Sequence, residues 1–192
     1  MAATEDGTSA RERLLAAAIE HVSQHGVGEI SLRAMAAALG TSHRMLIYHF
    51  GSREGLLIEV IRTVEEQQRM ALATILEDAD MPPAEIMRRM WARVADPALW
   101  PNERLFFEVY AQALQGSPHA LPLLDGIVDA WVEPLAALVA PDRAKDEARA
   151  EARLGVAVVR GLLLDLLATG DRDAVDAAME RYISAIAPAS RA

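Results

Sequence analysis

Residues 30–50, ISLRAMAAALGTSHRMLIYHF, decide the fold of the N-terminal part of this 192-residue chain. Ser31 is a favourable N-cap, and the apolar side chains after it recur at helical spacing. Those side chains are Leu32, Met35, Ala36 and Leu39. Gly40 ends the pattern, because glycine readily adopts the left-handed backbone that follows a helix. The pattern predicts one short helix that ends at a glycine turn.

A second short helix is predicted after the turn. Thr41 or Ser42 can cap it, and Met45 or Leu46 then faces inward together with Phe50. Its exposed side offers Ser42, His43, Arg44, Tyr48 and His49. Two short helices joined in this way are typical of a helix-turn-helix motif, which places its second helix in the major groove of DNA.

Another helix is predicted before this pair. Residues 9–12, Ser-Ala-Arg-Glu, form a capping box, and the helix that they open stops at Gly26. One face of that helix is apolar, with Leu14, Leu15, Ala18, Ile19 and Val22. Three helices can therefore share a small core. Residues 1–8 are polar and acidic, unlike a signal peptide, and we expect them to form a disordered arm.

The order of these features resembles the N-terminal DNA-binding domain of the TetR family of one-component transcriptional regulators. The motifs S-L-R-x-M-A-x-x-L-G-T-S, L-x-Y-H-F and G-S-R-E-x-L-L carry the resemblance and follow the first helix without a gap. The similarity spans about Ser9 to Val60, roughly a quarter of the chain. The family usually has a tyrosine directly after the leucine that matches Leu46, whereas this chain has Ile47 there and Tyr48 one place later.

The resemblance implies an all-α protein that binds a palindromic double-stranded DNA operator as a homodimer. Such a protein is most often a repressor that a small-molecule effector releases from DNA. Arg44 is the residue suited to guanine edges, and Arg53 is suited to phosphate. The full set of expected DNA contacts is Ser31, Arg33, Ser42, His43, Arg44, Met45, Tyr48, His49 and Arg53.

Composition limits the other classes of function. The chain contains no cysteine, which excludes disulfides and thiolate chemistry and suits a cytoplasmic location. Residues 1–55 hold five arginines and six acidic residues, a net charge of −1, which leaves −8 of the total −9 for the rest. DNA binding would therefore depend on a local patch of arginines, histidines and helix N-termini, with modest non-specific affinity.

The chain after Ser52 is predicted to be a series of long helices. One apolar stripe continues for about six turns from Leu56 to Ile75. Proline- and glycine-containing breaks then divide the rest into about five more helices, and no strand pattern is convincing. We therefore expect a helix-turn-helix domain over residues 9–55 and a helical effector-binding and dimerisation domain over residues 56–192.

Aromatic side chains gather in one part of this second domain. Five of the nine aromatics lie between positions 91 and 110. They either fill a core or line an effector cavity, and the expected set is Met87, Met90, Trp91, Trp100, Phe106, Phe107 and Tyr110. The polar groups that could orient an effector, each expected on the surface rather than in a pocket, are Asn102, Glu108, Gln112 and His119.

Residues 154–168, LGVAVVRGLLLDLLA, are apolar on nearly every side. The segment is too short for a membrane span and carries Arg160 and Asp165, so we expect a helix buried between its own core and a partner. The final helix has an apolar stripe that could join it in a four-helix interface, formed by Val175, Met179, Tyr182, Ile183 and Ile186. The expected homodimer contact spans roughly residues 150–187.

The remaining chemistries find little support in the sequence. His21 and His25 have the spacing of a metal-binding pair, but no carboxylate or cysteine is patterned with them, which favours a solvated helix face. We expect no enzymatic activity, cofactor, metal or membrane association. The alternative to a regulator is a helical dimerisation or small-molecule-binding protein whose helix-turn-helix has lost DNA affinity, which the −1 charge and Ile47 would suit.

Overall fold

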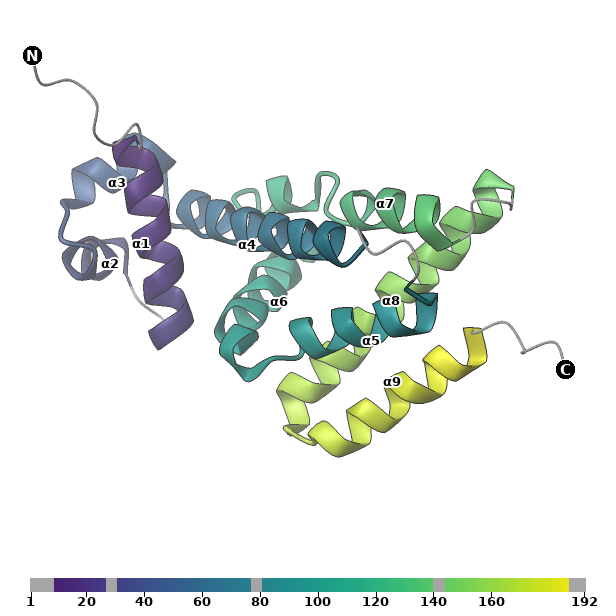
Figure 1. Cartoon of the computed structure of the whole chain (residues 1–192). Helices are drawn as coiled ribbons and strands as arrows, with labels where there is room; N and C mark the ends of the chain where they lie inside the picture. Colours follow the sequence, from purple (N-terminus) through teal and green to yellow (C-terminus); the bar gives the residue numbers. More distant parts are fainter. Residues whose placement is uncertain (1–8, 27–30, 77–80, 140–143, 187–192) are drawn as a thin grey trace, which may run out of the picture. The chain divides into compact units, whose positions relative to one another are not determined.

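The computed structural model describes residues 9–26, 31–76, 81–139 and 144–186, and its regular elements there are all helical (Figure 1). The predicted all-α fold is therefore confirmed. The predicted N-terminal arm, residues 1–8, lies outside the described residues. The α-helices are α1 (Ala10–His25), α2 (Leu32–Ala38), α3 (His43–Phe50), α4 (Arg53–Leu76), α5 (Pro83–Val94), α6 (Trp100–Leu114), α7 (Asp129–Val139), α8 (Lys145–Thr169) and α9 (Arg172–Ile186). Two short 3-10 helices, η1 (Pro97–Leu99) and η2 (Leu121–Leu124), complete the series.

The described chain divides into two compact units. The first contains residues up to 65 together with residues 101–123, and the second contains residues 66–100 and the chain from 124 onward. The helix-turn-helix lies in the first unit. Helix α4 is continuous over 24 residues, as the long apolar stripe predicts, and its first half belongs to the first unit.

The first four helices begin at the serines that the sequence predicts as caps, because capping is a local interaction. The Ser9 hydroxyl accepts a hydrogen bond from the Glu12 amide while the Glu12 carboxylate accepts one from the Ser9 amide, which completes the capping box. The Ser52 hydroxyl accepts a hydrogen bond from the Gly55 amide at 2.9 Å at the start of α4. Helix α6 begins at Trp100, with Pro101 in its first turn, where a proline needs no amide donor.

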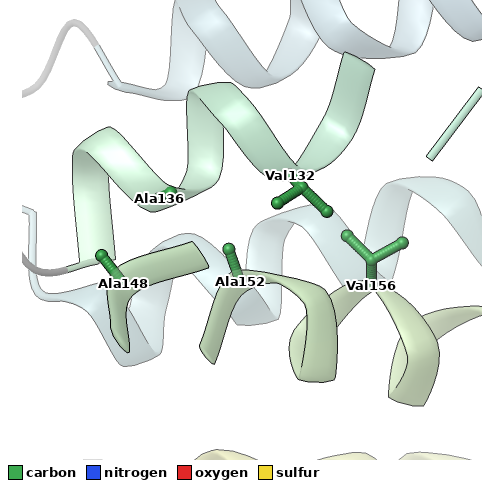
Figure 2. Packing of buried hydrophobic residues seen from close by; sticks show 5 residues of the cluster. All are labelled: Val132, Ala136, Ala148, Ala152 and Val156. Carbon is green, nitrogen blue, oxygen red and sulfur yellow. The ribbon is translucent and has the colours of Figure 1, made fainter. Parts of the chain in front are cut away.

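Helices α7 and α8 pack closely in the second unit (Figure 2). Val132 and Ala136 of α7 lie against Ala148, Ala152 and Val156 of α8, and all five side chains are buried. Three of the five are alanines, so the two backbones can approach closely. The N-terminal half of α8 is therefore used within its own chain.

Helices α5 and α9 are joined by polar side chains in the same unit. Arg88 forms a two-nitrogen contact with the Glu180 carboxylate, in which Nε lies 2.8 Å from Oε2. The Arg172 guanidinium donates 2.9 Å to the carbonyl oxygen of Ala95, just after α5. No helix within the described ranges is long and apolar enough to cross a membrane.

Candidate nucleic-acid interface

The turn between α2 and α3 has the geometry that a helix-turn-helix requires. Gly40 has a positive φ of 64°, which lets the chain reverse directly after α2. The Thr41 amide donates 2.9 Å to the carbonyl oxygen of Ala36, closing the end of α2. The Ser42 hydroxyl then accepts a hydrogen bond from the Met45 amide at 3.2 Å, so α3 starts at His43, three residues after the glycine.

Buried side chains hold α3 in the three-helix domain. Leu46 and Phe50 of α3 are buried, as the spacing predicts, whereas Met45 is exposed, which settles the choice between Met45 and Leu46. Arg11 of α1 lies over the ring of Phe50, with the guanidinium carbon of Arg11 5.3 Å from the ring centroid. The Nη2 atom of Arg11 also lies 2.9 Å from Oε2 of Glu59 on α4. Helices α1, α3 and α4 are thereby held together at one point.

The outward side of α3 carries the residues that the sequence singles out. Arg44, at the first turn, is exposed, and Tyr48, one turn later, is 79% exposed. The arginine side chain, which carries its guanidinium on three methylene groups, can reach a base edge from this position. The exposed residues at or next to the start of α3 and along its length are Ser42, His43, Arg44, Met45, Ile47 and Tyr48.

The stretch from α2 to the start of α4 is positively charged, despite the net charge of −1 over residues 1–55. Residues 30–53 contain three arginines and no aspartate or glutamate. Arg33 on α2 is exposed, and the Ser31 hydroxyl at the start of α2 accepts a hydrogen bond from the Ala34 amide at 3.2 Å while keeping its own proton to donate. Arg53 is only partly exposed and lies 3.9 Å from Glu54. The net charge of residues 1–55 is therefore slightly negative, although residues 30–53 are locally positive.

His49 is less available for phosphate than its neighbour. Its Nε2 atom is buried and has no hydrogen-bond partner among the described residues, and its ring lies edge-on to Tyr48 with centroids 4.9 Å apart. Tyr48 instead projects outward. The phenol of Tyr48 is thus the group on this helix that can replace the tyrosine absent at position 47.

The residues expected to line an effector cavity are divided between the two units. Met87, Met90, Trp91 and Trp100 lie in the second unit, and Phe106, Phe107 and Tyr110 in the first. The second group forms a ring cluster: Phe106 lies 5.3 Å from both Phe107 and Tyr110, measured between centroids. Trp91 is buried and donates a hydrogen bond to Asp176.

A small cavity does occur in the first unit, between α4 and α6. It is lined by Val60, Ile61, Val64, Glu65, Asn102, Glu103, Leu105 and Phe106, so only Phe106 comes from the expected set. Its volume of about 10 Å³ is enough for about one water molecule. The expectation that Asn102 lies on the surface is wrong, because its side chain is only 7% exposed. The Asn102 Oδ1 atom has no hydrogen-bond partner among the described residues.

The other polar candidates differ from Asn102. Glu108 and His119 are exposed, as expected, and Gln112 is half-buried with its amide 3.4 Å from Glu108. His21 and His25 stack at 4.7 Å between centroids, and no group of three metal-ligating side chains occurs in the described part of the chain. No spacing signal singled out Asn102 from these residues, since only the packing of α6 distinguishes them.

Comparison with known proteins agrees with this geometry. Residues 14–60 match the family model described as "Bacterial regulatory proteins, tetR family". The HTH-type transcriptional regulatory protein RaaS of Mycobacterium tuberculosis is 42% identical over 72 residues, which are 38% of this chain and 34% of that protein. The match thus spans about a third of the length of this relative.

Two solved structures extend the similarity to the fold of the whole chain. A transcriptional regulator from Rhodococcus sp. Rha1 is 21% identical with a TM-score of 0.75, covering 93% of this chain and 96% of its own. The multidrug binding protein EbrR, in complex with proflavin, is 25% identical with a TM-score of 0.63, covering 92% of this chain and 98% of its own. The similarity to these structures concerns the fold, an N-terminal helix-turn-helix followed by a helical domain. The N-terminal domain, over residues 14–60, is thus similar to the DNA-binding domain of the TetR family of bacterial regulatory proteins.

Proposed function

We propose that this protein is a transcriptional repressor that binds a palindromic DNA operator as a homodimer and leaves it when a small molecule binds. The observation that carries the DNA-binding part is the outward face of α3, with Arg44 exposed in its first turn and no acidic residue from 30 to 53. An arginine in the first turn of such a helix suits the O6 and N7 atoms of guanine. We expect the protein to act in the cytoplasm, where its DNA lies.

The exposed apolar side of α8 supports the homodimer. Leu154 is 54% exposed and Leu164 is 51% exposed. At Gly161 between them, no atom of the described residues lies within 4 Å of where a Cβ would be. Together with Ala157 these residues recur every three or four positions, which places them on one face of the helix. A second copy of the chain could therefore approach closely along this face.

The stripe expected on α9 is not part of that free surface. Val175, Met179 and Ile183 are buried within their own chain, so the prediction that they join a partner is wrong. Ala174 and Ala178 of α9 are small and exposed, and α9 contacts α8, so the two helices lie side by side (Figure 1). We propose a four-helix interface in which these two helices meet their symmetry mates.

The cavity between α4 and α6 supports a response to a small molecule. Its lining combines apolar side chains with oxygen acceptors, including the Oδ1 of Asn102, which no described residue pairs. An effector with an N–H or O–H donor would satisfy that atom. Because the cavity now holds about one water, a larger molecule would have to separate α4 from α6. Since α4 begins three residues after α3 ends, such a movement would change the position of the recognition helix.

The proposal is tested by selection of binding sites from random DNA, followed by a melting screen with small molecules. A palindromic consensus, a dimer on the DNA and a compound that raises the melting temperature and lowers operator affinity are expected. Absence of any enriched DNA would favour the alternative, a helical dimerisation or small-molecule-binding protein with a degenerate motif. The net charge of −1 over residues 1–55 is the observation that favours this alternative, because DNA-binding domains usually carry net positive charge.

A further inference from the structure

The exposed side of α3 carries large apolar side chains as well as charge. Met45 and Ile47 are each 39% exposed, beside the more exposed Tyr48. These three are among eight large exposed hydrophobic residues in the described chain, although α3 contains only eight residues. An apolar surface concentrated in this way generally marks a contact with another molecule.

Helical geometry places the two aliphatic side chains on either side of Arg44. Each residue of an α-helix is turned by about 100° from the one before it. Relative to Arg44, Tyr48 therefore lies at about 40°, Ile47 at about −60° and Met45 at about 100°, with the buried Leu46 on the opposite side at about 200°. A helix that presents Arg44 to one base pair thus presents Ile47 and Met45 to its neighbours.

We propose that Met45 and Ile47 determine sequence specificity by contacting the 5-methyl groups of thymines beside the base that Arg44 reads. This inference rests on the proposed DNA binding. The 5-methyl group of thymine is the apolar feature that base pairs present in the major groove. The surrounding charge also favours DNA over a second copy of the chain, because a symmetric contact through α3 would bring Arg33 and Arg44 against the same arginines.

The test removes single methyl groups from DNA. In the operator half-site obtained by selection, each dT is replaced in turn by dU, which keeps the Watson–Crick hydrogen bonds and loses only the 5-methyl group. Affinity is measured by fluorescence anisotropy with the full chain. The parent protein should bind roughly three- to fivefold more weakly at one or two positions, the change expected for one methyl group removed from an apolar contact.

Variants assign each position to a side chain. Ile47→Ala should bind the dT operator about as weakly as the parent binds the dU operator, and should no longer distinguish dT from dU at that position. Met45→Ala should lose the same distinction at a different position. Met70→Ala, which changes an exposed methionine of α4, is the matched control and should keep the full response to dU. Melting temperatures of all variants verify that they remain folded.

The outcomes separate this inference from the proposed function. If the parent binds a selected operator but tolerates dU at every position, the thymine contact is wrong and DNA binding stands. If Ile47→Ala changes the oligomeric mass in sedimentation while its sensitivity to dU is that of the parent, the apolar face is a protein contact and the inference is also wrong. If no DNA is selected, the proposed function fails and this inference fails with it.

Discussion

The indole Nε1 of Trp91 donates a hydrogen bond to Oδ1 of Asp176 at 2.6 Å. The second oxygen of the same carboxylate accepts from Nε of Arg172 at 2.7 Å. Trp91 is only 5% exposed, so its ring and its one polar atom are both used in packing α5 against α9. This relationship supports a structural role for Trp91, whereas the cavity lining in the first unit contains Phe106.

Trp91→Ala should therefore lower the free energy of unfolding of the protein. Loss of a large buried ring typically costs about 3–5 kcal/mol, and the Asp176 oxygen also loses its donor. Urea titration should show the loss of free energy of unfolding, with operator binding reduced in parallel. Trp91→Phe, which keeps a ring and removes only the hydrogen bond, is the control and should lose less. A folded Trp91→Ala protein with normal stability and an altered effector response would instead make Trp91 an effector contact.

Arg44→Ala should weaken binding to the selected operator by about 1–3 kcal/mol without changing the melting temperature. The reason is that the side chain is exposed and its contacts in the complex would be with base edges. Competition with random DNA measures the loss of specificity. Arg89→Ala, on the exposed surface of α5, is a matched arginine control. Equal operator affinity of the Arg44→Ala variant and the parent would show that Arg44 is merely a solvated arginine.

Arg53→Ala should weaken binding to specific and random DNA to a similar extent. A phosphate contact carries no sequence information, and its loss should flatten the slope of log affinity against log salt by roughly one. Affinities at several salt concentrations measure the slope. Because Arg53 is near Glu54, the salt series should be repeated with Glu54→Gln, which is expected to keep the slope. A variant that loses specificity at an unchanged slope would contradict the phosphate contact.

Asn102→Leu should remove an unpaired buried acceptor and fill the space with a side chain of similar size. We expect the free energy of unfolding to stay unchanged or to rise by about 1 kcal/mol. The stabilisation by any effector found in the melting screen should be lost, while operator binding without effector remains. Gln112→Leu, on the same helix but outside the cavity lining, is the control. An intact effector response in Asn102→Leu would place the effector elsewhere.

Tyr182 should make the protein less stable at alkaline pH. Burial raises the pKa of its phenol above the ordinary value of 10.0, and the nearby Glu151 carboxylate raises the pKa further. The folded state therefore holds the proton more tightly than the unfolded state, so the contribution is present below about pH 10 and falls as pH rises through the folded pKa. The free energy of unfolding is measured at pH 8 and at a pH above 10. The decrease between the two should be smaller in Tyr182→Phe than in the parent. Parallel pH profiles of the two proteins would contradict this assignment.

Local interactions explain why much of the helix-turn-helix could be predicted from the sequence. Ser9, Ser42 and Ser52 cap helices through hydrogen bonds to amides three residues away, and Gly40 supplies the turn. Such signals depend only on neighbouring residues. The register of Leu46 and Phe50 follows from helical spacing as well. The sequence by itself therefore determined the order of the N-terminal helices and the face that the second one exposes.

Only the tertiary structure decided how the surfaces of the later helices are used. Helical spacing shows that Val175 and Met179 share a face with Ile183, but not whether that face meets its own chain or a second copy. The same holds for Asn102, whose burial depends on residues of α4 about forty positions earlier in the chain. Periodicity defines which side chains lie together on a helix, whereas burial is a property of what packs against them, and that is set by contacts distant in sequence.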